Sequence, residues 1–125
     1  DTSDAQLLKS RWSAAVDTVG GAVLANLLRS TDHRGCIAAC GLVAGSELPL
    51  TVYPFILRGV TLAGIDSAQC PMPSRREIWN KLAGEWKPDD LASLATRINF
   101  SQLDEKIAHI LVGNIRGRVV VVPAT

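Results

Sequence analysis

The sequence predicts an α/β fold built on a parallel sheet. Residues 14–19 form a short apolar run with β-branched members that stops at Gly20-Gly21, which is typical of a strand buried on both faces. Leucines recur at i, i+3 and i+4 through residues 22–30, the pattern of an amphipathic helix. A second apolar run, residues 36–40, is closed by Gly41. Strand, helix and strand within about thirty residues predict a βαβ unit, whose ligands lie beyond the carboxyl ends of the strands.

Two further elements are expected in the middle of the chain. Residues 57–66 predict a third strand, and its interruptions at Gly59 and Gly64 suit the edge of a sheet. Ser74, followed three residues later by Glu77, has the spacing of a capping box and predicts the start of a helix. The apolar face of that helix consists of Ile78, Trp79, Leu82, Ala83 and Trp86.

The last third of the chain predicts short alternating elements. Residues 89–95 are expected to be helical and residues 97–100 to form a short strand. Ser101 and Asp104 resemble another capping box before a helix at residues 102–112, and the Val-rich residues 118–122 predict a final strand.

Composition excludes several classes of protein. The 125 residues suffice for one domain, and 47% apolar residues exclude a disordered tail. Thirteen Lys and Arg against twelve Asp and Glu give a net charge of +1, without the basic block of a nucleic-acid-binding protein. No apolar run approaches the roughly 20 residues of a membrane span. We therefore expect no nucleic-acid partner and no membrane insertion.

The cysteines indicate a cellular compartment, and the first residues indicate whether the chain is a whole protein. Three cysteines are an odd number in a chain without a secretory signal, so we expect reduced thiols and a cytoplasmic location. The first four residues, Asp-Thr-Ser-Asp, resemble neither a signal peptide nor a natural start. We expect the chain to be a fragment.

Residue chemistry alone identifies no catalytic or metal site. Cys36 and Cys40 on one strand would lie about 13 Å apart, too far for one zinc ion, so we expect small buried thiols used in packing. The only histidines, His33 and His109, accompany no Gly-x-Ser-x-Gly elbow. The paired carboxylates at residues 89–90 and 104–105 lie near expected helix starts, where they complement the helix dipole.

The glycine-rich residues 41–45 give only a weak signal for a ligand loop, because Gly-x-Gly-x-x-Gly is absent. The residues therefore support a parallel half-sheet with a ligand-facing edge, and no particular reaction.

A resemblance supplies what spacing does not. The motifs Pro-Phe-Ile-Leu-Arg-Gly-Val at residues 54–60 and Gly-Ile-Asp-Ser at residues 64–67 resemble the C-terminal part of the zinc-free medium-chain dehydrogenase/reductases that include acrylyl-CoA reductases and quinone oxidoreductases. The similarity extends over residues 11–21, 24–26, 38–42, 51–60, 62–67 and 113–118.

The resemblance implies a division into two domains. Residues 1–96 would be the latter part of a Rossmann-type NAD(P)-binding domain, with a β-α-β unit followed by an edge strand. Residues 97–125 would be a helix-strand segment of the GroES-like catalytic domain. The glycine fingerprint and much of the substrate pocket would lie outside this chain.

The resemblance also places cofactor contacts for NADP(H) on specific residues. Val19 and Gly20 would border the adenosine, Cys40, Gly41 and Leu42 would lie against the nicotinamide with Ile56 nearby, and Ile65, Asp66 and Ser67 would flank the carboxamide. Asn114 would bind the cofactor from the catalytic-domain side. Structural alternatives remain for four of them: Gly41 as a strand stop, Leu42 and Ile56 as core residues, and Asn114 as a left-handed helix cap.

The implied reaction is hydride transfer from NADPH to an activated double bond, such as that of an acrylyl thioester, or to a quinone, and no residue of the chain is identified as its acid. Members of this family commonly pair through the edge of the Rossmann sheet, which predicts a homodimer through residues 60–65. The alternative is a non-enzymatic α/β module that uses the same half-sheet for interaction or dimerisation.

Overall fold

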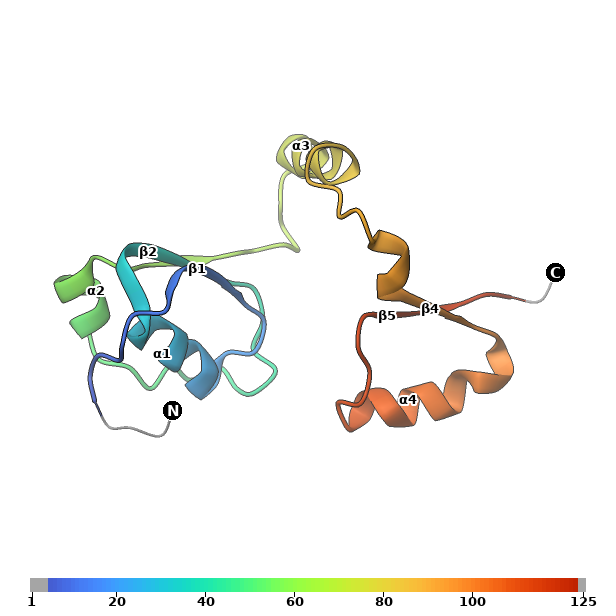
Figure 1. Ribbon diagram of the computed structural model, residues 1–125, viewed down its shortest axis with the longest axis horizontal. Coiled ribbons are helices and arrows are strands. Elements are labelled where there is room, and N and C mark those ends of the chain that lie inside the picture. The colour runs from blue at the N-terminus through green and yellow to red at the C-terminus, as the bar shows by residue number, and fades with distance from the viewer. Residues whose placement is uncertain (1–4, 124–125) are drawn as a thin grey trace. The chain divides into compact units, whose positions relative to one another are not determined.

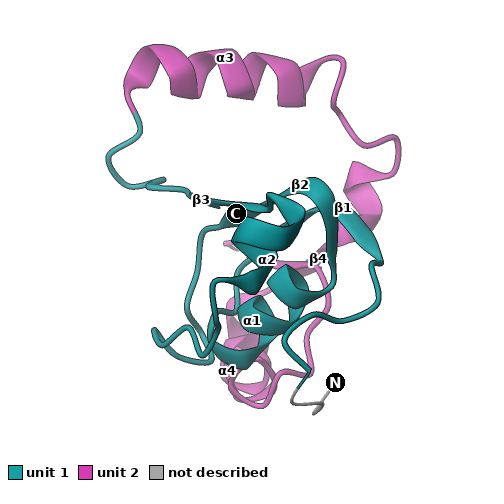
Figure 2. Ribbon diagram, turned by 90° about the vertical axis from the view of Figure 1, so that its left-hand side faces the viewer, with its two compact units in different colours: residues 1–70 teal, residues 71–125 magenta. Residues whose placement is uncertain are grey.

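The computed structural model describes residues 5–123, and the chain divides into two compact units after Cys70 (Figures 1 and 2). The boundary expected at residue 96 falls instead within β4 (Ala95–Ile98), a strand of the second unit. The assignment of the two segments to two domains of a longer protein stays a prediction.

The first unit contains a three-stranded parallel sheet. Its elements, in chain order, are β1 (Trp12–Asp17), α1 (Gly21–Arg29), β2 (Thr31–Ala39), α2 (Tyr53–Arg58) and β3 (Thr61–Gly64). The strand order is β1-β2-β3, so β2 is central and β3 lies at an edge. The predicted parallel βαβ unit and the edge position of the third strand are confirmed.

The pairing register aligns the carboxyl ends of the three strands. Asp17 pairs with Ala39, and Ala39 pairs with Gly64, so the last residues of all strands form one row. The register shifts between Trp12 and Ala14, where residues 32–35 of β2 stand opposite Ser13 alone. The irregularity is confined to the amino ends of the strands and leaves the carboxyl edge regular.

The core lies on one face of this sheet. Leu24 and Leu28 of α1 pack with Ile37 of β2 and with Val60, and Phe55 of α2 joins them. On the opposite face of β1, Val16 is 71% exposed. The prediction that the first strand is buried on both faces is therefore wrong, since Val16 is exposed and the core described for the first unit lies on the other face.

The third strand is shorter than the sequence suggests. Residues 57 and 58 end α2, which starts with Pro54 in its first turn, where a missing amide costs nothing. Gly59 caps this helix in the left-handed conformation with φ of 62°. The apolar residues 55–57 thus belong to a helix, and Gly59 marks its end and does not interrupt a strand.

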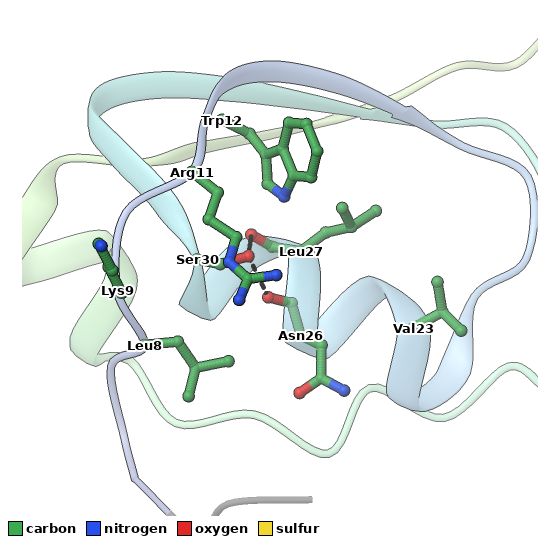
Figure 3. A pocket seen from close by; sticks show the side chains of 8 residues that line it. All are labelled: Leu8, Lys9, Arg11, Trp12, Val23, Asn26, Leu27 and Ser30. Atoms are coloured by element: carbon green, nitrogen blue, oxygen red, sulfur yellow. Dashed lines mark hydrogen bonds between the residues drawn. The ribbon is translucent and has the colours of Figure 1, made fainter. Parts of the chain in front are cut away.

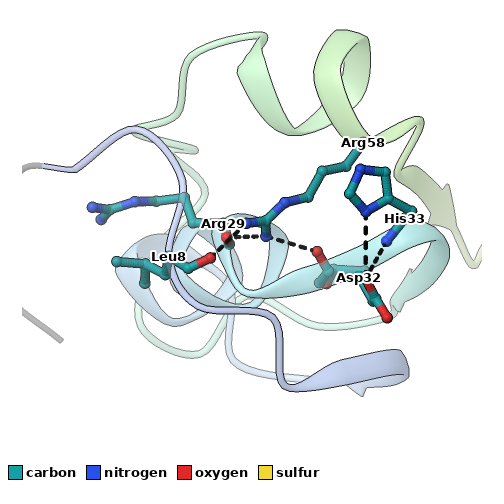
Figure 4. A network of polar contacts seen from close by, with 6 residues as sticks. Leu8, Arg29, Asp32, His33 and Arg58 are labelled. Atoms are coloured by element: carbon teal, nitrogen blue, oxygen red, sulfur yellow. Dashed lines mark hydrogen bonds and ion pairs between the residues drawn. The ribbon is translucent and has the colours of Figure 1, made fainter.

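Arg58 ties three segments of the first unit together (Figure 4). Its Nη1 donates to the carbonyl oxygens of Arg29 and Thr31, each at 3.0 Å, and its Nη2 donates to that of Leu8 at 2.7 Å. The guanidinium therefore satisfies carbonyls at the end of α1, where positive charge also complements the helix dipole.

The second unit contains a smaller parallel pair of strands. Its elements are α3 (Met72–Ala83), η1 (Leu91–Leu94), β4, η2 (Phe100–Gln102), α4 (Leu103–Leu111) and β5 (Arg118–Val121). Strands β4 and β5 pair in parallel. Ile98, the last residue of β4, is buried. The helix expected at 102–112 and the last strand are confirmed to within one residue at each end, and the expected helix at 89–95 is the shorter 3-10 turn η1.

Both predicted capping boxes are wrong. The first residue before α3 is Pro71, which has no side chain to cap it, and Ser74 lies within the helix. The capping box of the second unit is formed by Asn99 and Gln102, two residues ahead of the expected pair. No helix within residues 5–123 has the length and apolar character needed to cross a membrane.

Candidate functional site

An open groove of about 550 Å³ lies at the carboxyl edge of the parallel sheet. It is formed where β2 and β3 end and their following turns diverge. The residues that line it are Ala39, Cys40, Gly41, Leu42, Gly64, Ile65 and Asp66. This is the edge at which open parallel sheets bind ligands.

Main-chain hydrogen bonds join the residues that directly follow β2 and β3 to the last residues of the neighbouring strands. The Cys40 amide donates to the Asp17 carbonyl at 2.8 Å, and the Ile65 amide donates to the Ala39 carbonyl at 2.9 Å. The Cys40 thiol also lies 3.4 Å from the Asp17 carbonyl oxygen, as a donor. The segments after the strands therefore leave the sheet from fixed positions.

The turn after β1 packs tightly on the segment after β2. The Ala44 amide donates to the Val19 carbonyl at 2.8 Å, and Gly20 forms an isolated parallel bridge with Gly45. A Cβ on Gly20 would lie 2.6 Å from the Gly45 carbonyl oxygen, and Gly20 has φ of 74°. Only glycine fits this position without displacing the backbone.

Gly41 is equally restricted, for a different reason. A Cβ on this residue would lie 2.3 Å from the Thr18 carbonyl oxygen, closer than any van der Waals contact allows. Gly41 therefore does more than end the strand: because it has no side chain, the turn after β1 and the segment after β2 can lie in contact.

The surface of the groove is mostly apolar and partly without side chains. Leu42 is 64% exposed, Ile65 is also exposed, and Gly41 and Gly64 contribute only backbone. A Cβ on Gly64 would meet no atom within 4 Å, so space is open there. The Asp66 carboxylate, which accepts a hydrogen bond from the Gln69 amide at 3.0 Å, is the one acid that lines it. A flat, largely apolar ring with polar substituents fits these surroundings.

The structure brings five of the ten predicted cofactor residues to this groove, namely Cys40, Gly41, Leu42, Ile65 and Asp66. Ser67 follows directly, with its amide donating to the Ile65 carbonyl at 3.1 Å. Val19 and Gly20 lie in the turn that packs on the segment after β2.

Two predicted residues lie elsewhere. Ile56 is 68% exposed on α2 and does not line the groove, and Asn114 lies in the second unit, in the turn before β5. The left-handed residue of that turn is Gly113, with φ of 73°, so the expectation of a left-handed cap at Asn114 is wrong. The alternative that Leu42 and Ile56 are core residues is also wrong, since both are largely exposed.

Ala39 and Gly64 line the groove and were not expected to do so. Gly64 ends an apolar run and begins the Gly-Ile-Asp-Ser motif, and these two features are the sequence signal for its place in the groove. Their position follows from the register, which places both in the last row of the sheet.

The cysteines are free thiols, but two of them are not packing residues. Cys36 and Cys40 are exposed and Cys70 is half-buried, which contradicts the expectation of buried thiols. Within residues 5–123 no group of three or more His, Cys, Asp or Glu side chains is arranged to hold a metal ion.

A second, smaller groove lies at the opposite end of β1 (Figure 3). It is lined by Leu8, Lys9, Arg11, Trp12, Val23, Asn26, Leu27 and Ser30. The Ser30 hydroxyl is 2.7 Å from the Asn26 carbonyl, to which it donates, so it is engaged by the end of α1. None of the predicted site residues lies there.

Known proteins with this sequence pattern are oxidoreductases. The Bacillus subtilis protein named "Putative quinone oxidoreductase YhfP" is 45% identical over 116 residues, which cover 92% of this chain and 35% of YhfP. The acrylyl-CoA reductase AcuI of Ruegeria pomeroyi is 43% identical over 110 residues, 88% of this chain and 33% of AcuI. The chain is similar to these oxidoreductases over most of its own length. It spans about a third of the length of these relatives, and no protein-family model matches it.

Crystal structures of similar proteins contain the same fold. Bacillus subtilis YhfP with NAD bound matches 94% of this chain, and 36% of its own, with a TM-score of 0.83 and 43% identity. Escherichia coli YhdH with bound NADPH matches 95% of this chain, and 37% of its own, with a TM-score of 0.85 and 39% identity. The α/β fold with parallel sheets thus corresponds to the C-terminal part of the cofactor-binding domain in these proteins.

Proposed function

We propose that this chain is part of an NADP(H)-dependent oxidoreductase that reduces an activated carbon-carbon double bond, as in an acrylyl thioester, or a quinone. The observation that carries the proposal is the groove at the carboxyl edge, whose lining includes five of the residues that the family resemblance assigns to the cofactor. Relatives at 39–43% identity whose crystal structures contain NAD or NADPH support it.

The groove residues fit a nicotinamide nucleotide. Leu42 and Ile65 offer apolar side chains to one ring, while Gly41 and Gly64 leave backbone accessible beside it. The turn at Val19 and Gly20 would border the adenosine, and Ile65, Asp66 and Ser67 would flank the carboxamide. Ile56 and Asn114 complete the proposed contacts from outside the groove.

When bound, the nicotinamide would supply a hydride to the β-carbon of the acceptor, and a proton added to the resulting enolate would complete the reduction. The task of this chain is then orientation, because Leu42 and Ile65 are apolar, the Cys40 thiol donates to the Asp17 carbonyl, and the Asp66 carboxylate accepts the Gln69 amide. The acid that delivers the proton is assigned to no residue here.

One substitution tests the cofactor groove directly. Leu42→Asp places a carboxylate where an anionic dinucleotide would bind, and Val43→Asp makes the same change one residue away, outside the groove lining. In calorimetric titration of NADPH into the full-length protein that contains this chain, Leu42→Asp is expected to weaken binding at least about tenfold. Val43→Asp should bind like the wild type. Absence of NADPH and NADH binding by the wild-type protein contradicts the proposal.

The acceptor is decided by turnover. Loss of NADPH absorbance with acrylyl-CoA, and none with a benzoquinone, assigns the reductase of an activated double bond, and the reverse pattern assigns the quinone oxidoreductase. Activity with neither acceptor contradicts this part of the proposal.

The proposal includes a homodimer paired through residues 60–65. It is supported by the edge position of β3 in the sheet, which leaves its outer backbone groups unpaired within the described chain. Thr61→Lys puts like charges at that edge, and sedimentation should then give the mass of a monomer, whereas Val52→Lys on the exposed start of α2 should leave the dimer intact. A wild-type monomer at all concentrations refutes the dimer and leaves the cofactor proposal untouched.

The alternative of a non-enzymatic interaction module has the same exposed edge in its favour. The similarity to oxidoreductases at 43–45% identity over almost the whole chain supports the enzyme instead. A cytoplasmic location and the assignment of residues 97–125 to a catalytic domain are part of the proposal.

A further inference from the structure

A buried carboxylate lies at the end of β1, where the turn toward the groove begins. Asp17 is 2% exposed, and its Oδ2 accepts a hydrogen bond from the Gly20 amide at 2.8 Å. Its Oδ1 is buried and has no hydrogen-bond partner among the described residues. Burying a carboxylate with one oxygen unpaired costs free energy, so the residue requires an explanation beyond packing.

The bond to Gly20 fixes the conformation of the turn. Gly20 precedes α1 with φ of 74° and ψ of −162°, and it has no side chain with which to cap the helix. Asp17 lies three residues earlier and holds the Gly20 amide from outside the helix. The negative charge also lies at the amino end of α1, where the helix dipole favours it.

The backbone of the same residue holds the second segment of the site. The Asp17 carbonyl accepts the Cys40 amide at 2.8 Å, directly before Gly41. Asp17 thus fixes the turn after β1 through its side chain and the start of the groove segment after β2 through its main chain.

The two segments have no slack between them. A Cβ added at Gly20 or Gly41 would lie 2.6 Å or 2.3 Å from a carbonyl oxygen of the facing segment, so the two main chains already lie too close for a side chain between them. A shift of the turn after β1 is therefore expected to move the segment that carries Cys40, Gly41 and Leu42.

We propose that Asp17 is a positioning residue for the groove: its side-chain oxygen holds the Gly20 turn so that the Cys40 to Leu42 segment keeps the shape that binds the nucleotide. The inference rests on the proposed function for the identity of the ligand. It assigns to Asp17 the role of a hydrogen-bond acceptor, and no contact with the ligand.

Two variants separate this role from general stability. The side-chain amide introduced by Asp17→Asn retains an oxygen that accepts the Gly20 amide, whereas Asp17→Ala leaves that amide without its partner. Thr31→Val is the matched control, since Thr31 is fully buried and its hydroxyl donates to the Leu27 carbonyl at 2.7 Å, at the other end of the same βαβ unit.

The measurements are NADPH affinity of the full-length protein and hydrogen exchange of the Gly20 amide. Asp17→Ala should raise the dissociation constant about tenfold and speed exchange at Gly20, with a larger effect on KM for NADPH than on kcat. Asp17→Asn should stay within about threefold of the wild type in both measurements. Thr31→Val should lower the melting temperature without changing NADPH affinity.

Each other result overturns the inference. Unchanged affinity in Asp17→Ala refutes positioning, an equal loss in Asp17→Asn shows that charge rather than acceptance matters, and an equal loss in Thr31→Val reduces the effect to stability. If the wild type binds no NADPH, the proposed function fails, and Gly20 exchange alone decides the role of Asp17 in the turn: faster exchange in Asp17→Ala supports it, and unchanged exchange refutes it.

Discussion

Gly41→Ala is the substitution that tests the geometry of the groove most sharply. The added methyl group would lie 2.3 Å from the carbonyl oxygen, 2.9 Å from the carbonyl carbon and 3.0 Å from the Cα of Thr18. All three atoms belong to the backbone, so no side-chain rotation can relieve the contact. The ends of β1 and β2 must move apart by about 1 Å to restore an ordinary van der Waals distance.

The cost of that movement follows from what holds the two segments together. Separation strains the hydrogen bond from the Cys40 amide to the Asp17 carbonyl and that from the Ala44 amide to the Val19 carbonyl, both 2.8 Å long. Overpacking in a closely packed region costs about 1–3 kcal/mol, and because the strain here falls on backbone, we expect about 3 kcal/mol of lost stability.

Equilibrium urea unfolding followed by far-UV circular dichroism measures this loss, and calorimetry measures NADPH affinity of the same variant. Gly64→Ala is the control, because its methyl group would meet no atom within 4 Å while lying in the same groove. It should unfold within about 0.5 kcal/mol of the wild type and still weaken NADPH binding, by occupying ligand space. A Gly41→Ala variant as stable as the wild type refutes the close approach of the two turns.

Three further substitutions have defined outcomes. Arg58→Met removes the donor to three carbonyls and should lower the free energy of unfolding in urea by about 2 kcal/mol. An unchanged free energy of unfolding would show that these hydrogen bonds do not stabilise the fold. Gly117→Ala combines φ of 75° with a Cβ 2.3 Å from the Leu94 carbonyl oxygen, so urea unfolding should show a loss of about 3 kcal/mol, and a stable variant would contradict this. The His33 amide, at 2.8 Å, and the His33 ring lower the pKa of Asp32. A lowered pKa stabilises the folded protein above the unfolded pKa, near about pH 4, and the benefit disappears as pH falls through the folded pKa. The difference in urea midpoint between the wild type and Asp32→Asn should therefore shrink as the pH falls below about 4. A difference that grows in acid contradicts the lowered pKa of Asp32.

The sequence predicts elements best where one physical signal dominates. The leucine spacing of α1 and the valine run of β5 leave one interpretation each, and both elements are found as expected. Residues 55–57 are an apolar run too short to show helical periodicity, so only the position of Pro54 indicates that they form a helix. Capping depends on the backbone conformation of individual residues, and a Ser-x-x-Glu pattern at residue 74 cannot show that the helix already started at Met72.

The sequence mispredicts burial for apolar residues whose composition resembles that of a core. Val16 and the apolar residues of α3 have the composition of buried positions, yet they are exposed in this chain. The matched relatives are about three times as long, so similar positions in them belong to larger folds. An apolar pattern indicates that a surface is in contact with something, but it does not show which chain or segment covers that surface.

The candidate site could not be derived from residue chemistry because its geometry resides in the backbone. Gly20 and Gly41 matter for the side chains they lack, and the aligned row of Asp17, Ala39 and Gly64 follows from register, which no single residue reveals. The functional groups of three side chains in the turn and groove are already engaged: Asp66 accepts the Gln69 amide, the Cys40 thiol donates to the Asp17 carbonyl, and the buried Asp17 accepts the Gly20 amide. A site of this kind binds by shape and leaves the chemistry to its ligand, so a resemblance across whole segments detects it while a search for acids, bases and metal ligands does not.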